Sequence, residues 1–109
     1  MLGLIKKWLS KFIPDPIDVV QLKKEGAILI DVRTPQEFKS GKLKGAKNFP
    51  VQSIHQNINK IKKLNRKNKT VILYCRSGGR AGRAQSILRR NGIDAVNAGG
   101  YAQLKRILG

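Results

Sequence analysis

Two short, continuous apolar runs constrain the fold of this chain more than any other feature. They are AILIDV at residues 27–32 and TVILY at residues 70–74. A strand with one face in water alternates apolar and polar residues, whereas each of these runs is apolar throughout and therefore predicts a strand buried on both faces. Such strands occur in parallel sheets that helices cover on both sides. The runs predict a parallel sheet between two layers of helices.

The remaining segments predict helices and one more strand. Thr34, followed by Pro35 and Glu37, is typical of a helix start, and this helix is expected to end at Ser40. Apolar residues recur at helical spacing from Val51 to Leu64, with His55 off the apolar stripe and expected at the surface. The other expected elements are a short helix that opens at Ile17 and ends at Gly26, a helix over 81–90, a strand over 95–97 and a last helix to Leu108. Strands that alternate with helices predict an α/β fold of three layers with a mainly parallel central sheet.

Charge and cysteine content limit the class of protein. The 109 residues fit one small domain, and 23 Lys and Arg against 6 Asp and Glu give a net charge of +17, which attracts anions. The single cysteine, Cys75, excludes an internal disulfide, a CxxC redox pair and a cysteine-rich zinc site. Neither a metal nor an organic cofactor is expected. Six aromatic residues, mostly at core positions, disfavour nucleic acid as the partner. The basic stretch over 60–69 is interpreted as a solvated helix end and loop, with a docking or nucleic-acid patch as the alternative.

The first 14 residues are expected to be separate from the domain over 15–109. Apolar residues from Leu2 to Ile13 recur at helical spacing and lie opposite Lys6, Lys7 and Lys11, which predicts a basic amphipathic helix. With a length of roughly 18 Å, this helix could bind weakly to the surface of an anionic membrane but could not span one. The alternative is that it packs on the domain. Because this segment is a poor secretory signal, the protein is expected in the cytoplasm, either free or peripheral on the membrane.

The stretch TVILYCRSGGRAGRA at residues 70–84 carries the chemistry. Here a buried strand leads directly into Cys75, a glycine-rich turn and a helix, and the carboxyl end of a strand is where open α/β sheets bind ligands. Ser77, Gly78 and Gly79 allow a tight loop whose N–H groups point inward, where the helix dipole also favours an anion. That anion is expected to be the Cys75 thiolate.

Two arginines in the same stretch suit an anionic substrate. Arg76 and Arg80 carry guanidinium groups that can bind a sulfonate, a phosphate or a similar oxyanion. The alternative is that Cys75 is a small buried apolar residue, as many free cysteines are. The glycines and arginines around it favour a functional cysteine, whereas Arg83 and Arg89 are expected to be surface charge.

CRSGGR at residues 75–80, together with LIDVRTPQEFKSGKLKGAKNFP at 29–50, resembles a single-domain rhodanese of the thiosulfate sulfurtransferase-like family. The resemblance covers roughly residues 16–108 and implies a three-layer rhodanese-like fold. It implies that Cys75 takes a sulfane sulfur from a donor such as thiosulfate, becomes a persulfide, and passes the sulfur to cyanide or a thiol acceptor. It also implies that the persulfide and the donor are bound by Arg76, Ser77, Gly78, Gly79, Arg80 and the backbone of Ala81. The basic exterior is expected to attract anionic donors or an acidic acceptor protein.

Departures from the family pattern affect structural positions. Gly41–Ala46 reads GKLKGA where the family commonly has a GHIPGA turn, and Tyr101 follows Gly99-Gly100 where a tryptophan is common, which leaves the packing of the last helix open. Asp31 and Arg33 are interpreted as a buried ion pair, and Glu37 as a helix cap, rather than as catalytic groups.

Other functions stay open at this point. A Cdc25-like phosphatase or arsenate reductase is less favoured, because those loops have five residues between the cysteine and the arginine and this one has four. The sequence is also compatible with a persulfide carrier that does not turn over, and with a basic docking module.

Overall fold

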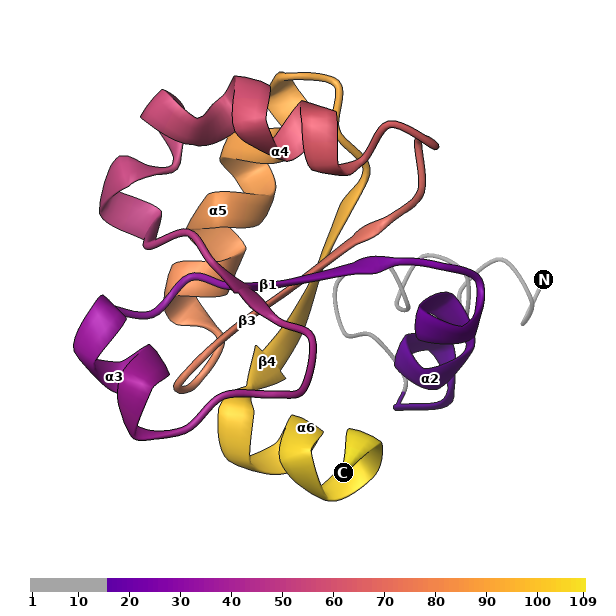
Figure 1. Cartoon of the computed structure of the whole chain (residues 1–109), viewed down its shortest axis with the longest axis vertical. Helices are drawn as coiled ribbons and strands as arrows, with labels where there is room; N and C mark the ends of the chain where they lie inside the picture. Colours follow the sequence, from indigo (N-terminus) through magenta and orange to yellow (C-terminus); the bar gives the residue numbers. More distant parts are fainter. Residues whose placement is uncertain (1–15) are drawn as a thin grey trace, which may run out of the picture.

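The computed structural model describes residues 16–109, which form a parallel sheet with helices on both faces (Figure 1). The strands lie in the order β2-β1-β3-β4, and every neighbouring pair is parallel. Their bounds are β1 Ile28–Asp31, β2 Lys47–Asn48, β3 Val71–Cys75 and β4 Ala95–Gly100. The helices are α2 Pro16–Lys24, α3 Pro35–Ser40, α4 Ile58–Leu64, α5 Gly79–Arg90 and α6 Tyr101–Leu108. This α/β architecture confirms the predicted fold class.

Strand positions follow the apolar runs closely. β1 and β3 differ from the predicted ranges by one residue at each end. β4 is longer than expected and includes both Gly99 and Gly100. The two-residue β2 was not predicted, because it contains no apolar run. The expected amphipathic helix over 2–13 and its membrane contact lie outside the described residues. None of the helices described within residues 16–109 combines the length and the apolar composition that a membrane span requires.

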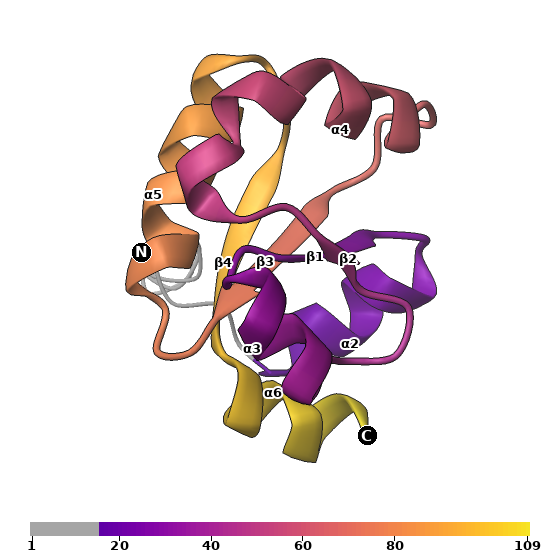
Figure 2. The ribbon, with the colours of Figure 1, turned by 60° about the vertical axis from the view of Figure 1, so that its left-hand side comes forward.

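Alternating side chains of β3 build two separate cores. Val71, Leu73 and Cys75 point to the face covered by α4 and α5, while Ile72 and Tyr74 point to the face covered by α2, α3 and α6. Figure 2 shows these two groups of helices on opposite sides of the strands. All five side chains are at most 1% exposed. The two-sided burial predicted from TVILY is therefore confirmed.

The segment over 51–64 corrects a prediction, because it is not one helix. It consists of two 3₁₀ turns, Val51–Ser53 and His55–Asn57, followed by α4. The hydroxyl of Ser53 donates to the carbonyl of Pro50 (3.2 Å), and the amide of Asn57 donates to the carbonyl of Ser53 (2.9 Å). Such local side-chain bonds compete with the regular helix. His55 is exposed, as predicted.

A buried ion pair between Asp31 and Arg33, at the end of β1, contacts both the loop at Gly41 and the first residue of α6. Arg33 donates from Nη2 and Nε to Oδ2 of Asp31 (2.6 and 3.0 Å), and Nη2 also donates to the carbonyl of Gly41 (2.5 Å). Its guanidinium lies 4.4 Å from the ring centroid of Tyr101 and 5.6 Å from that of Tyr74, whose pKa is raised by burial. The predicted ion pair is confirmed. The ring of Tyr101 stacks on the guanidinium of Arg33 and so fixes α6.

We predict that Arg33→Leu destabilises the domain strongly, because it leaves the Asp31 carboxylate buried without its charged partner. The free energy of unfolding, measured with urea, should fall by about 3–5 kcal/mol. Adding Asp31→Asn removes the buried charge and should recover part of the loss. Arg83→Leu, at an exposed position on α5, is the control and should change stability by about 0.5 kcal/mol or less. A loss below about 1 kcal/mol for Arg33→Leu would contradict this account.

Candidate active site

Cys75 is the last residue of β3, and pairing on both edges of the strand fixes its position. β3 pairs with β1 and β4, and Cys75 lies opposite Gly100. The residue is 1% exposed, while Arg76 and Ser77, which follow it, are exposed. The chain thus passes from the fully buried sheet to the surface within one residue. This places the sulfur at the carboxyl edge of the sheet, as predicted.

Backbone amides at the start of α5 surround the sulfur. The N–H groups of Gly78 and Ala81 donate to Sγ of Cys75, at 2.9 and 3.4 Å. The helical ladder begins only with the N–H of Gly82, which donates to the carbonyl of Gly78 (2.9 Å). The amides of Gly79 and Arg80 precede that ladder and lie at the positive end of the helix dipole. The arrangement favours negative charge on and next to the sulfur.

The loop has this shape because two positions exclude a side chain. Gly78 has φ +102°, a left-handed conformation, and a Cβ there would lie 3.4 Å from Cα of Gly99. A Cβ on Gly100 would lie 2.6 Å from the carbonyl oxygen of Arg76, which no real structure allows. Asn97 joins the two segments, since its amide donates to the carbonyl of Gly78 and accepts from the N–H of Gly99, both at 2.9 Å. The end of β4 therefore supports the cysteine loop directly.

The two arginines of the loop have different surroundings. Arg80 donates from Nη1 and Nη2 to the two carboxylate oxygens of Glu37, at 2.6 and 3.0 Å. Glu37 also forms the predicted capping box with Thr34 at the start of α3. Hydrogen bonds from Arg80, supported by those from Thr34, lower the pKa of Glu37 to about 2. Arg80 therefore ties the loop to α3, and the exposed Arg76 is the arginine left at the mouth of the loop.

Several contacts here carry no signal in the local sequence. Asn97 and the pairing of Glu37 with Arg80 join segments far apart in the chain, so no local pattern predicts them. Arg89 is exposed, as expected, and its Nε also donates to the carbonyl of Ala95 (3.0 Å). Arg83 is exposed, as expected. Among residues 16–109 no group of three or more His, Cys, Asp or Glu side chains could hold a metal.

A parallel sheet in the order β2-β1-β3-β4, with a cysteine held by backbone amides where β3 meets α5, places this chain among the rhodanese-like α/β proteins. The chain belongs to the rhodanese family, since the sequence model of the Rhodanese-like domain matches residues 15–106.

Relatives support this assignment. The chain is 38% identical over 76 residues to the thiosulfate sulfurtransferase PspE of Escherichia coli, and the match covers 69% of this chain and 71% of that protein. It is 47% identical over 70 residues to the uncharacterized protein YqhL of Bacillus subtilis. This match covers 64% of this chain and 52% of YqhL, so the chain spans about half the length of that relative. The crystal structure of SSP1007 from Staphylococcus saprophyticus is 34% identical, with a TM-score of 0.65, and covers 79% of this chain and 88% of that one.

We predict that Gly78→Ala disturbs the cysteine loop, whereas Gly92→Ala does not. Both glycines have positive φ, and a Cβ on Gly92 meets no atom within 4 Å. Each substitution should cost about 1–2 kcal/mol of stability, because L-residues disfavour this conformation. Only Gly78→Ala should shift the amide NMR signals of Ala81 and its neighbours in the loop. If the Ala81 signal stays in place, the account of the loop is wrong.

We predict that Glu37→Gln removes a contribution to stability that depends on pH. Because the pKa of Glu37 falls from 4.5 to about 2 on folding, its contribution is fully present above pH 4.5 and is lost as the pH falls toward 2. At neutral pH the wild type should exceed the variant by about 1 kcal/mol in urea unfolding, given that the pair is partly exposed. Glutamine keeps hydrogen-bonding atoms for the cap, so the difference reports the charge. A difference independent of pH between 5 and 2 would contradict this assignment.

Proposed function

We propose that this protein is a sulfurtransferase that carries a sulfane sulfur on Cys75 as a persulfide, from a donor such as thiosulfate to cyanide or a thiol acceptor. The observation that carries the proposal is the pair of N–H bonds from Gly78 and Ala81 to Sγ of Cys75. Donors fixed by the backbone stabilise a sulfur anion without any rearrangement during the reaction. The E. coli relative is a thiosulfate sulfurtransferase, which supports the same chemistry.

The first half-reaction transfers one sulfur atom. The thiolate of Cys75 attacks the outer sulfur of thiosulfate, a bond forms between the two sulfurs, and the sulfur–sulfur bond of thiosulfate breaks. Its electron pair leaves with sulfite, and the negative charge of the enzyme moves to the outer sulfur of the persulfide. The amides of Gly79 and Arg80, at the start of α5, lie at the same end of the helix and suit that outer sulfur.

The second half-reaction restores the thiolate. Cyanide, or a thiolate acceptor, attacks the outer sulfur of the persulfide, and the electron pair of the breaking bond returns to Sγ of Cys75. The products are thiocyanate, or a persulfide on the acceptor. No oxidant or reductant enters either step.

Arg76 and Ser77 are proposed to meet the donor at the mouth of the loop. Both are exposed and directly follow Cys75. A guanidinium at this position suits the sulfonate end of thiosulfate, which remains outside while its outer sulfur reacts. The net charge of +17 adds long-range attraction for such anions, and this attraction weakens as salt rises.

Phosphatase chemistry is not favoured by this loop. A phosphate has three outer oxygens to bind, and the arginine that would complete a cage, Arg80, directs both terminal nitrogens to Glu37. A small loop with a single sulfur at its centre suits the transfer of one sulfur atom.

We predict that brief exposure to thiosulfate adds one sulfur atom, about 32 Da, to the wild-type chain and none to Cys75→Ser. Intact-protein mass spectrometry measures the adduct, and cyanide or a thiol should remove it. Because Cys75 is the only cysteine of the chain, the adduct needs no further assignment.

Turnover distinguishes the enzyme from a carrier. The enzyme should form thiocyanate continuously from thiosulfate and cyanide, whereas a carrier loads once and waits for its own acceptor. His55→Gln, at an exposed position outside the cysteine loop, is the control variant and should load and turn over as the wild type does. The absence of an adduct with thiosulfate and with other sulfane donors would overturn the proposal.

A further inference from the structure

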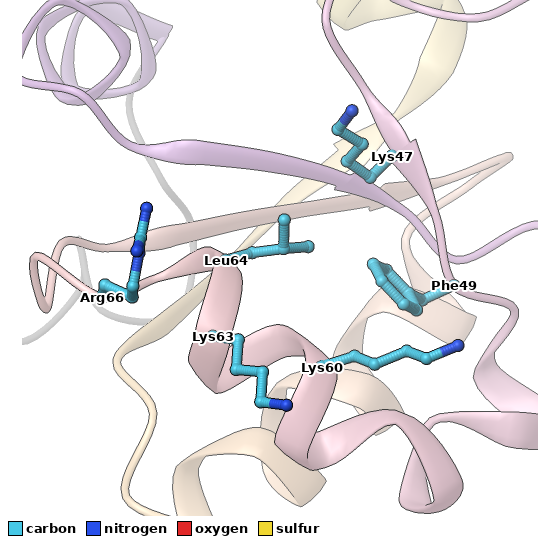
Figure 3. Close-up of a pocket in the computed structure, with 6 residues that line it drawn as sticks. All are labelled: Lys47, Phe49, Lys60, Lys63, Leu64 and Arg66. Atoms are coloured by element: carbon cyan, nitrogen blue, oxygen red, sulfur yellow. The ribbon is translucent and has the colours of Figure 1, made fainter.

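A basic hollow with an apolar centre lies beside α4, away from the cysteine loop. It has a volume of about 600 Å³. Its lining residues come from α4, the loop after α4 and the β2 edge of the sheet: Lys47, Phe49, Lys60, Lys63, Leu64 and Arg66 (Figure 3). In the close-up, Leu64 lies in the middle of the group, and the charged ends point outward around it. The arrangement joins an apolar contact with a ring of cations.

Leu64 belongs to neither of the two hydrophobic cores. It is 43% exposed and is the one large apolar residue of the described chain that is exposed to this degree. It also lines two adjoining hollows, of about 480 and 270 Å³, so the three hollows form one surface around it. Phe49, by contrast, is partly buried and packs against the core, where it forms an apolar wall of the first hollow.

This surface has a large excess of positive charge. The three hollows together are lined by eight cations and a single carboxylate, Glu25; the cations are Lys23, Lys44, Lys47, Lys60, Lys63, Arg66, Lys67 and Lys69. Both ion pairs found among residues 16–109, Arg33 with Asp31 and Arg80 with Glu37, lie elsewhere. The charge of the surface is therefore not neutralised by the described part of the chain.

Leu64 and the loop after α4 lie toward the start of β3, and the cysteine loop follows its end. The β2 edge of the surface, with Lys47 in register with Ile30 and Leu73, lies between them along the strand. Lys69 lies just before the strand, and Cys75 ends it. The five residues of β3 span about 13 Å between their first and last Cα atoms, and Figure 1 shows α4 and the turn before α5 at different ends of this strand. A partner bound around Leu64 leaves the loop at Cys75 open.

We propose that this surface docks an acidic protein segment that carries an apolar side chain. Carboxylates of the partner would face the lysines, and its apolar side chain would cover Leu64. A small inorganic anion has nothing to cover Leu64 with. Nucleic acid is less suited, because seven of the eight cations are lysines and the only aromatic residue is a partly buried phenylalanine. The chain's own first 14 residues are basic themselves, with Lys6, Lys7 and Lys11, and would be repelled.

The test uses the full chain and a fluorescent, glutamate-rich peptide with one central leucine, followed by fluorescence anisotropy at low salt. We predict that the double variant Lys60→Glu, Lys63→Glu weakens binding by about tenfold or more. Leu64→Ser, which changes no charge, should weaken it several-fold. The same peptide with serine in place of leucine should bind more weakly and should not distinguish Leu64→Ser from the wild type.

The matched control carries the same change in net charge at exposed positions outside the three hollows, Arg83→Glu with Arg106→Glu. It should retain most of the affinity, and circular dichroism should show all variants folded. Equal weakening by the two double variants would overturn the proposal, because only net charge would then matter. An unaffected Leu64→Ser would overturn the apolar contact, and stronger binding of a single-stranded oligonucleotide of equal charge at the same residues would overturn the choice of a protein partner.

Discussion

The burial of β3 on both faces and both edges is the constraint on which the rest of the structure depends. A strand without access to water must pair its backbone groups within the protein, and β3 does so with β1 and β4. A shift by one residue would exchange the side chains of its two faces, moving Tyr74 into the core that now holds Leu73 and Cys75. The register is therefore fixed, and with it the position of the sulfur at the carboxyl edge of the sheet.

The shape of the cysteine loop depends in turn on β4. The ladder between β3 and β4 is irregular between Leu73 and Cys75, so that Cys75 lies opposite Gly100. Because Gly100 has no side chain, the carbonyl of Arg76 can approach its backbone, and Asn97 holds the carbonyl of Gly78 from the same strand. These contacts belong to the folded scaffold, so the amides around the sulfur are in place before any substrate binds.

Local sequence patterns predict the parts of this protein that local interactions determine. The apolar runs predict β1 and β3, and Thr34 with Glu37 predicts the start of α3, since a capping box forms within four residues. The helical spacing of apolar residues over 51–64 wrongly predicts one continuous helix. Hydroxyl and amide side chains in this segment compete for the backbone carbonyls that such a helix would use. The pair of Glu37 with Arg80 spans 43 positions and depends on the packing of α3 beside the loop, which no local pattern encodes.

Positive charge serves different physical purposes at the two ends of β3. Near the carboxyl end, the guanidinium of Arg33 is fixed by three hydrogen bonds to one carboxylate and that of Arg80 by two, so these charges hold side chains in a fixed geometry. Around Leu64 most of the cations are lysines, whose ammonium groups stay hydrated on flexible stems and act over roughly a Debye length of 8 Å at physiological salt. The pair of Arg80 with Glu37 holds the loop against α3, whereas the hydrated lysines would set how fast the proposed acidic partner arrives. Because different residues carry these two properties, the proposed chemistry at Cys75 and the proposed docking of a partner can change independently.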